Sequence, residues 1–156
     1  MPNYRFVALD TDRLQSLRRR DGRADGLRPC RKTVEPDGVA PCRHCLKDAG
    51  PGETVILTSL SPFSGTGPYN ERGPIFLHEA SCSRATPSTA IPEIVANRLV
   101  IIRAYSEKEE IIDADLTEGR DADRLIERLL ANKNASFLHV RTARYGCYLC
   151  RVERTL

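Results

Sequence analysis

Two Cys-x-x-Cys pairs are the part of this sequence in which chemistry is easiest to foresee. Cys42 and Cys45 form the first pair, and Cys147 and Cys150 form the second, close to the end of the chain. Two such pairs can supply four thiolates to one tetrahedral metal ion, for which zinc is the usual choice. A single pair can instead carry out dithiol redox chemistry. The pairs themselves specify neither a substrate nor a reaction.

A zinc site made by all four cysteines is the first interpretation. The number of thiolates is right, and three histidines are alternative ligands: His44, His78 and His139. The ion binds such ligands without any redox change of its own, so the site could serve structure alone. The sequence therefore predicts a metal-binding or structural module with a Cys/His site.

The local sequence of the two pairs departs from that of a zinc ribbon. In a ribbon, glycine often follows the second cysteine of each pair, but here Leu46 follows Cys45. Cys147 and Cys150 begin a segment of strand-forming residues, and in a regular strand they would face opposite sides. Either a turn or a bulge must bring them together. We expect Cys147 to approach Cys42, and Cys150 to be either packed in the core or brought round by a bulge.

Thiol chemistry through Cys42 is the alternative. Pro41 suits the first position of a helical turn, so residues 42–48 are expected to form one or two helical turns. A thiol at the start of a helix has a lowered pKa, so Cys42 would be the attacking thiolate of a redox protein or a thiol-dependent enzyme. Cys82 lies in an expected loop and is the main rival of Cys42 as a reactive thiol.

Composition indicates an ordinary soluble globular protein. The chain has 156 residues, of which 40% are hydrophobic and 29% are charged, and this length favours one domain over residues 1–156. Its apolar runs are too short to span a bilayer, and its N-terminus has no apolar signal core. We therefore expect a cytoplasmic protein that does not enter a membrane, in a compartment where thiols stay reduced.

Basic residues gather in one short stretch near the N-terminus although the net charge is only +3. No aromatic residue is interleaved with them, as a single-strand nucleic-acid binder would require. We therefore expect a solvated face and no nucleic-acid partner, and the sequence specifies no other partner. The residues of this basic stretch are Arg13, Arg18, Arg19, Arg20, Arg23, Arg28, Arg31 and Lys32.

The pattern of apolar residues predicts an α+β domain on a mostly antiparallel sheet with two main helices. Several connections between strands are too short for a helical crossover, which favours antiparallel pairing. The expected helices span Arg13–Arg20 and Asp121–Leu130. The expected strands span Tyr4–Leu9, Arg31–Glu35, Glu53–Leu60, Gly73–Glu79, Leu99–Tyr105, Ile111–Leu116, Phe137–Arg141 and Tyr148–Glu153.

Four short motifs occur in a fixed order along the chain. They are PCRHCL at residues 41–46, GPIFLH at 73–78, FLHVR at 137–141 and GCYLCR at 146–151. Together they resemble a bacterial family known as domain of unknown function twelve-oh-three, and the resemblance covers nearly the whole chain. It implies a single bacterial domain of this length and carries no assigned activity.

Overall fold

The structure is a computed structural model that describes residues 2–20, 22 and 28–156. It confirms the α+β class, with antiparallel strand pairing throughout the three sheets and two main helices, α1 and α3. No helix in the described part of the chain has the length and apolar character needed to cross a bilayer. In chain order the elements are β1 (Tyr4–Val7), α1 (Thr11–Arg18), β2 (Cys30–Thr33), β3 (Ala40–Pro41), β4 (Asp48–Ala49), β5 (Thr54–Leu60), β6 (Gly73–His78), α2 (Glu93–Ala96), β7 (Leu99–Tyr105), β8 (Ile111–Glu118), the 3-10 turn η1 (Gly119–Asp121), α3 (Ala122–Ala131), β9 (Phe137–Thr142) and β10 (Tyr148–Arg154).

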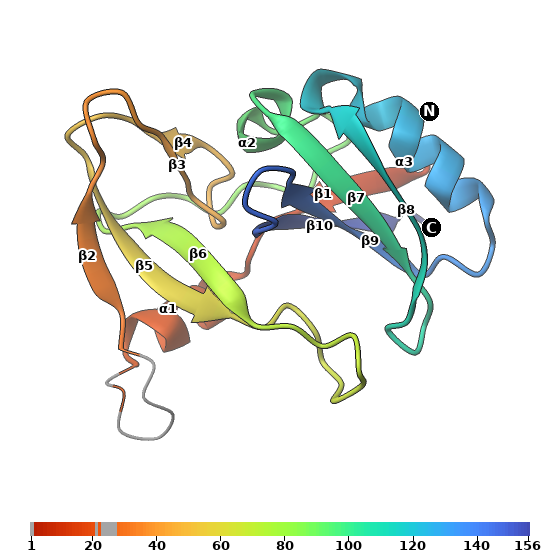
Figure 1. Ribbon diagram of the computed structural model, residues 1–156, viewed down its shortest axis with the longest axis horizontal. Helices are drawn as coiled ribbons and strands as arrows, with labels where there is room; N and C mark the ends of the chain where they lie inside the picture. Colours follow the sequence, from red (N-terminus) through yellow and green to blue (C-terminus); the bar gives the residue numbers. More distant parts are fainter. Residues whose placement is uncertain (1, 21, 23–27) are drawn as a thin grey trace.

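The larger sheet has five strands in the order β1-β10-β9-β7-β8 (Figure 1). β7 and β8 form a hairpin, and the predicted bounds of β7, Leu99–Tyr105, match the structure. Between the last two strands the chain turns at Gly146, whose φ of +73° favours glycine. The N-terminal strand closes one edge by pairing with the C-terminal strand, so the two ends of the chain stabilise the same sheet.

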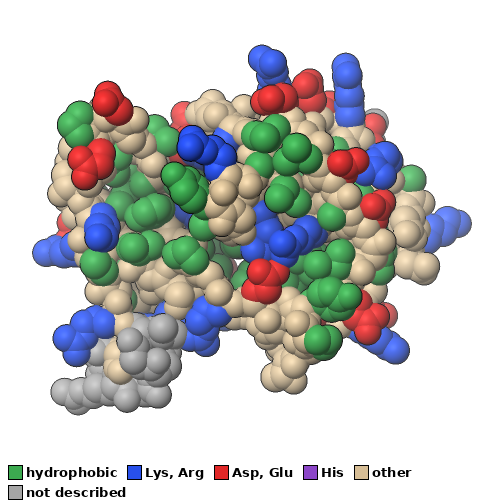
Figure 2. Space-filling view, viewed as in Figure 1, with side chains coloured by type: hydrophobic (Ala, Val, Ile, Leu, Met, Phe, Trp, Pro, Cys, Tyr) green, Lys and Arg blue, Asp and Glu red, His purple; other side chains and the backbone are tan. Residues whose placement is uncertain are grey.

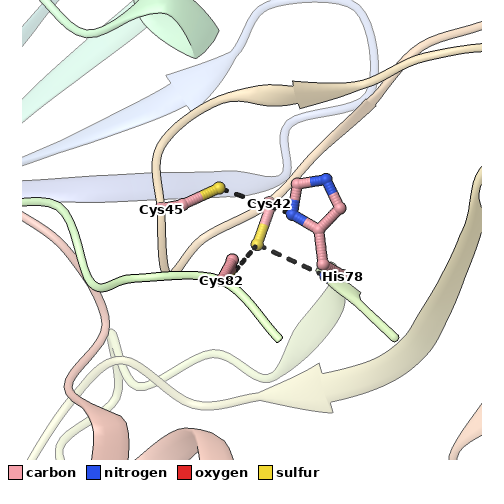
Figure 3. Close-up of side chains that lie close together, drawn as sticks. All are labelled: Cys42, Cys45, His78 and Cys82. Atoms are coloured by element: carbon pink, nitrogen blue, oxygen red, sulfur yellow. Dashed lines mark hydrogen bonds between the residues drawn. The ribbon is translucent and has the colours of Figure 1, made fainter. Parts of the chain in front are cut away.

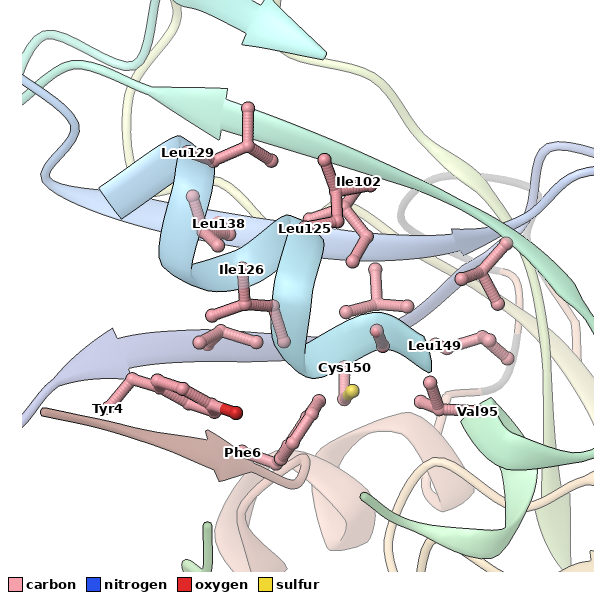
Figure 4. Close-up of a cluster of buried hydrophobic side chains, with 14 of the residues drawn as sticks. Tyr4, Phe6, Val95, Ile102, Leu125, Ile126, Leu129, Leu138, Leu149 and Cys150 are labelled. Atoms are coloured by element: carbon pink, nitrogen blue, oxygen red, sulfur yellow. The ribbon is translucent and has the colours of Figure 1, made fainter. Parts of the chain in front are cut away.

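Helix α3 covers one face of this sheet and forms the main hydrophobic core with it (Figure 4). The five apolar residues that the sequence predicts at helical spacing are buried: Ala122, Leu125, Ile126, Leu129 and Leu130. They pack against side chains of β7 and β9 such as Ile102 and Leu138, which are completely buried.

A β-bulge decides where the last cysteine lies. The register between β10 and β9 shifts between Tyr148 and Cys150, which places the neighbours Leu149 and Cys150 both in the main core. Burial raises the pKa of the Cys150 thiol to about 12, so it remains protonated at neutral pH. Of the two outcomes expected for Cys150, packing in the core is the one that the structure shows, and the bulge is its cause.

The smaller half of the molecule is a three-stranded sheet, β2-β5-β6, with the two-stranded hairpin β3-β4 beside it (Figure 1). Helix α1 packs Leu14 and Leu17 against apolar side chains of β5 and β6. Asp10 caps α1 by accepting a hydrogen bond from the backbone N–H of Arg13.

Parts of the basic stretch bind the smaller sheet rather than water alone. Arg18 donates to the carbonyl oxygen of His78, and Arg20 donates to that of Ser59 at 2.9 Å. Arg13 and Arg19 are exposed, as expected for a solvated face. Position 23 of the stretch lies outside the described residues.

A long connection, residues 79–92, joins the smaller sheet to the larger one and contains almost no regular structure. It is fixed by individual contacts: Ser88 pairs with Phe6 of β1, and the backbone N–H of Ala85 donates to the carbonyl of His44 at 2.9 Å. Arg84 donates to the carbonyl of Ala8 at 2.8 Å. The connection ends in the short helix α2, which the sequence did not predict.

Candidate metal centre

The first cysteine pair lies in a tight turn between β3 and β4. The prediction of a helix over residues 42–48 is wrong, because the backbone N–H of Cys42 pairs across the turn with the carbonyl of Lys47 at 3.0 Å. The N–H of Leu46 also donates to the carbonyl of Cys42 at 3.0 Å and closes the loop around the pair. This hairpin turn holds both cysteines on one side, which is the knuckle that a zinc ribbon requires.

Leu46 occupies the position at which such a knuckle usually carries glycine. Its φ is +59°, in the left-handed region that side chains other than glycine seldom adopt. The side chain is 4% exposed and belongs to the main core, so burial offsets the backbone strain. The absence of glycine therefore does not prevent the knuckle from forming.

Replacement of Leu46 by glycine tests this balance. The change relieves about 1–2 kcal/mol of left-handed strain but removes a buried leucine, whose truncation costs about 3–5 kcal/mol. We expect the free energy of unfolding to fall by roughly 1–4 kcal/mol, while metal content stays unchanged because the turn is kept. Urea denaturation and elemental analysis of the same preparation measure the two quantities. A gain in stability would show that strain outweighs burial at this position.

Two further ligands approach the knuckle from elsewhere in the chain. His78 is the last residue of β6, and Cys82 lies four residues later, at the start of the 79–92 connection. One ligand atom from each of Cys42, Cys45, His78 and Cys82 lies within 4.8 Å of the other three. Figure 3 shows the four side chains converging from the knuckle, the end of β6 and the connection.

The distances within this group suit a tetrahedral ion. Zinc–sulfur and zinc–nitrogen bonds of about 2.3 and 2.0–2.1 Å place tetrahedral ligand atoms about 3.8 Å apart for two sulfurs and about 3.6 Å for sulfur and nitrogen. The Sγ atoms of Cys42 and Cys82 lie 4.0 Å apart, and Sγ of Cys45 lies 3.4 Å from Nδ1 of His78. Small side-chain adjustments would bring all four atoms into coordination.

The backbone around Cys42 favours its thiolate. The thiol of Cys45 donates to the Cys42 sulfur, the backbone N–H groups of Cys45, His78 and His44 point at it, and together they lower the pKa of Cys42 to about 4 in spite of its burial. The N–H of His78 lies 3.3 Å from this sulfur. The same hydrogen bond raises the pKa of Cys45, and burial raises that of Cys82. One thiolate is thus stabilised without a metal, and a cation would be needed to deprotonate the other two.

Surrounding residues orient the ligands. His44 is 2% exposed; its Nδ1 lies 3.2 Å from the Cys82 sulfur and its Nε2 lies 3.0 Å from the hydroxyl of Thr11. When Cys82 is a thiolate it can only accept, so His44 donates from Nδ1 and accepts from Thr11 at Nε2. On the other side of the group, a carboxylate oxygen of Glu53 lies 3.7 Å from Nε2 of His78. Carboxylate and histidine pairs of this kind commonly set the orientation of a metal ligand.

Of the predicted site residues, the structure brings together Cys42, Cys45 and His78, and it places His44 beside the group. It does not place Cys147 and Cys150 in the group. Cys150 lies in the main core, and Cys147 lies after the β9-β10 turn, where its backbone N–H donates to Thr142 at 3.1 Å. His139 lies in β9 on the larger sheet, within a cluster of aromatic rings.

The sequence reasoning missed Cys82 as a ligand. It treated this residue only as an exposed rival thiol, because neither Cys-x-x-Cys pair contains it. A usable signal was present, since His78 ends a strand and Cys82 follows it by four residues, within the spacing that zinc ligands use in pairs. Pairing this His-x-x-x-Cys segment with the first cysteine pair gives the set that the structure assembles.

Comparison with known families gives one match. The family described as "Protein of unknown function (DUF1203)" matches residues 39–154, most of the chain. The chain belongs to this family. The matched region contains all four members of the metal-ligand group. Searches among curated proteins and among solved structures gave no match.

Proposed function

We propose that this DUF1203 protein binds one zinc ion through Cys42, Cys45, His78 and Cys82, and that the ion has a structural role. The observation that carries the proposal is the convergence of four ligand atoms from three separate segments, all within 4.8 Å of one another. Thiolate-rich tetrahedral sites favour zinc over magnesium, calcium and manganese, which prefer oxygen ligands. All six cysteines lie in the described part of the chain and are free thiols, so they are available to a metal.

The position of the group supports a structural role. Four protein ligands complete a tetrahedral zinc site and leave no open position for a substrate, as in structural sites generally. An ion here would fasten the β3-β4 knuckle to the end of β6 and to the irregular 79–92 connection. Because that connection has little regular secondary structure and is held by individual contacts, a metal cross-link would add a further constraint.

A buried arginine balances the charge of the proposed site. Zinc with three thiolates carries a net charge of −1, which is costly to bury without compensation. Arg43 is 2% exposed, and it donates to the carbonyls of Pro41 at 2.6 Å and Tyr148 at 2.7 Å. No carboxylate among the described residues pairs with it, whereas the Cys42 and Cys147 thiols lie near enough to oppose the lowering of its pKa by burial. A negative metal centre would supply the counter-charge.

Thiol chemistry through Cys42 remains the second candidate because of its lowered pKa, to about 4. Two observations weigh against it: the Cys42 side chain is completely buried, and no helix starts at this residue. A nucleophile must reach its substrate, whereas a metal ligand need not. We therefore favour a ligand role for the Cys42 thiolate.

Metal content tests the proposal directly. Protein purified without added metal or chelator is expected to contain about one zinc per chain by elemental analysis. Replacement of Cys82 by serine should reduce this to less than about a tenth of an equivalent, because three ligands hold zinc far more weakly than four. Replacement of Cys147 by serine is the matched control and should leave the content unchanged. Equal zinc in both variants, or none in the unmodified protein, would contradict the proposal.

A further inference from the structure

The face of the five-stranded sheet that points away from α3 carries an unusual row of polar residues. His139 of β9 is paired in register with Arg103 of β7 on one side and with Arg151 of β10 on the other. Arg141 follows two residues later on the same face of β9, because side chains alternate along a strand. Three arginines from three adjacent strands therefore surround one histidine.

His139 is buried without a polar partner. Its side chain is 0% exposed, and neither ring nitrogen has a hydrogen-bond partner among the described residues. The Nε atom of Arg141, which is 5% exposed, also lacks one. Burial and the charges of Arg141, Arg151 and Arg103 lower the pKa of His139 to about 2, so its ring is neutral and offers one donor and one acceptor. Buried polar atoms left without partners are uncommon and costly, and they point to a ligand here.

The loop between β5 and β6 places a carboxylate on this cluster. Glu71 lies 2.5 Å from a guanidinium nitrogen of Arg103 and 3.5 Å from one of Arg141. Its side chain is 45% exposed, whereas that of Arg141 is only 6% exposed, so a surface carboxylate contacts a buried cation. The same loop places the ring of Phe63 4.9 Å from that of His139. The loop thus covers the cluster with an anion and an aromatic ring.

Charge on this face is not balanced by the pairs that it contains. Arg151 pairs with Glu153 at 3.0 Å, but Glu153 also pairs with Arg5 at 3.4 Å. Together with the two arginines on Glu71, four guanidinium groups share two carboxylates, which leaves an excess of two positive charges. Figure 2 shows basic side chains beside an acidic one at the middle of this face of the molecule. A phosphate monoester carries about −1.5 to −2 at neutral pH and matches that excess.

A cavity beside the cluster provides room for the rest of a ligand. The cavity measures about 440 Å³ and is lined by Phe63, Tyr148 and Arg151 among others. Both aromatic rings that line it also contact His139, at 4.9 and 5.0 Å between centroids. Arg84 lines the same cavity and donates to the backbone carbonyls of Leu9 and Ala8. Its lining is therefore aromatic and carries three basic side chains, Arg13, Arg84 and Arg151, against the two carboxylates of Asp10 and Glu153.

We propose that Arg103, Arg141, Arg151 and His139 form a binding site for the phosphate group of a small phosphate monoester, and that Glu71 caps this site by taking the place of the anion. The guanidinium groups would bind phosphate oxygens in pairs, as arginine does at phosphate sites, and the neutral His139 ring would donate one further hydrogen bond. The organic part of the ligand would lie in the adjoining cavity. The proposal does not depend on the metal site, which is built from other residues.

Isothermal titration calorimetry at low ionic strength with phenyl phosphate tests the proposal, with benzoate as the singly charged control that carries the same ring. The protein is expected to bind phenyl phosphate with a Kd below about 1 mM and benzoate at least about tenfold more weakly. Replacement of Glu71 by glutamine removes the competing anion and should tighten phenyl phosphate binding roughly three- to fivefold. Inorganic phosphate shows how much of the affinity comes from the phosphate group alone.

Variants of the arginines complete the test. Arg103→Gln and Arg141→Gln should each weaken phenyl phosphate binding by about tenfold or more, because each removes charge-assisted hydrogen bonds. Arg128→Gln is the matched control: Arg128 pairs with Asp113 and Asp115 on the surface, and its loss should leave binding unchanged. Because Arg141 is buried, Glu71→Gln, at an exposed position, decides the matter if that variant does not fold. No phenyl phosphate binding by either the unmodified protein or Glu71→Gln, or equal binding by the two, would overturn the proposal.

Discussion

Removal of the metal with a chelator is expected to lower the melting temperature of the protein by roughly 8–16 °C. A ligand present at a thousand times its Kd stabilises the folded state by about 4 kcal/mol, and each kcal/mol shifts the melting temperature of a domain of this size by about 2–4 °C. The proposed ion links the knuckle that holds Cys42 and Cys45 to His78 and Cys82, so its loss would free all three segments. Thermal unfolding followed by circular dichroism, with and without chelator, measures the shift.

Two variants show whether the shift comes from this site. Cys147→Ser keeps all four ligands and should respond to the chelator as the unmodified protein does. Cys82→Ser should melt at the lower temperature and show no further response. Hydrogen exchange should show that protection is lost first in residues 42–49 and 79–92, while the larger sheet under α3 keeps its own core. Zinc-loaded protein that melts at the same temperature with and without chelator would rule out a structural metal.

Patterns that reflect local physics predicted most of the larger sheet. Alternating or continuous apolar residues located β7, β9 and β10, and helical spacing located α3, because each of these elements buries a regular set of side chains. The segment between β7 and β8 is short and charged, which suits the hairpin that these strands form. Such features depend on residues that are close together in the sequence, so they can be predicted from one sequence.

The knuckle could not be predicted in the same way. Pro41 indicated a helical start, but the pairing of β3 with β4 overrides it, and that pairing covers only two residues on each strand. Leu46 adopts a positive φ because the core on its other side holds its side chain. Both effects come from contacts between distant parts of the chain, and local propensity does not reveal them.

In the candidate ligand set, too, one part follows from local sequence and the other depends on contacts between distant segments. The spacing of Cys42 and Cys45 correctly predicts that these two cysteines lie side by side, because the tight turn that contains both fixes their separation. The partners of that pair depend on the arrangement of β6 and the connection after it, and the second Cys-x-x-Cys pair was a better match by spacing than Cys82. The bulge in β10 then sends Cys150 into the core, where its burial is useful as packing.

Replacement of Gly119 by alanine is expected to lower the free energy of unfolding by about 3–5 kcal/mol. A Cβ at this position would lie 1.7 Å from the carbonyl oxygen of Val95 and 2.7 Å from that of Arg98, both of them backbone atoms that cannot rotate away. The N–H of Gly119 also donates to the Arg98 carbonyl at 2.9 Å, and a shift large enough to admit a methyl group would break this bond. Urea denaturation monitored by circular dichroism measures the loss.

Gly119→Ala should also weaken zinc binding at the candidate metal centre, because α2 is hydrogen-bonded to the knuckle and to β4. The N–H of Ile94 donates to the carbonyl of Leu46 at 3.3 Å, and the carboxylate of Glu93 accepts from the N–H of Asp48 at 2.7 Å. Displacement of α2 would pull on both contacts, so we expect the variant to release zinc to a competing chelator faster than the unmodified protein. Gly73→Ala is the matched control, since a Cβ there meets no atom within 4 Å and should change stability by less than about 0.5 kcal/mol. If the two variants were equally stable, α2 and η1 would have to separate at little cost in free energy. If Gly119→Ala were destabilised but released zinc at the rate of the unmodified protein, the knuckle would keep its shape without α2.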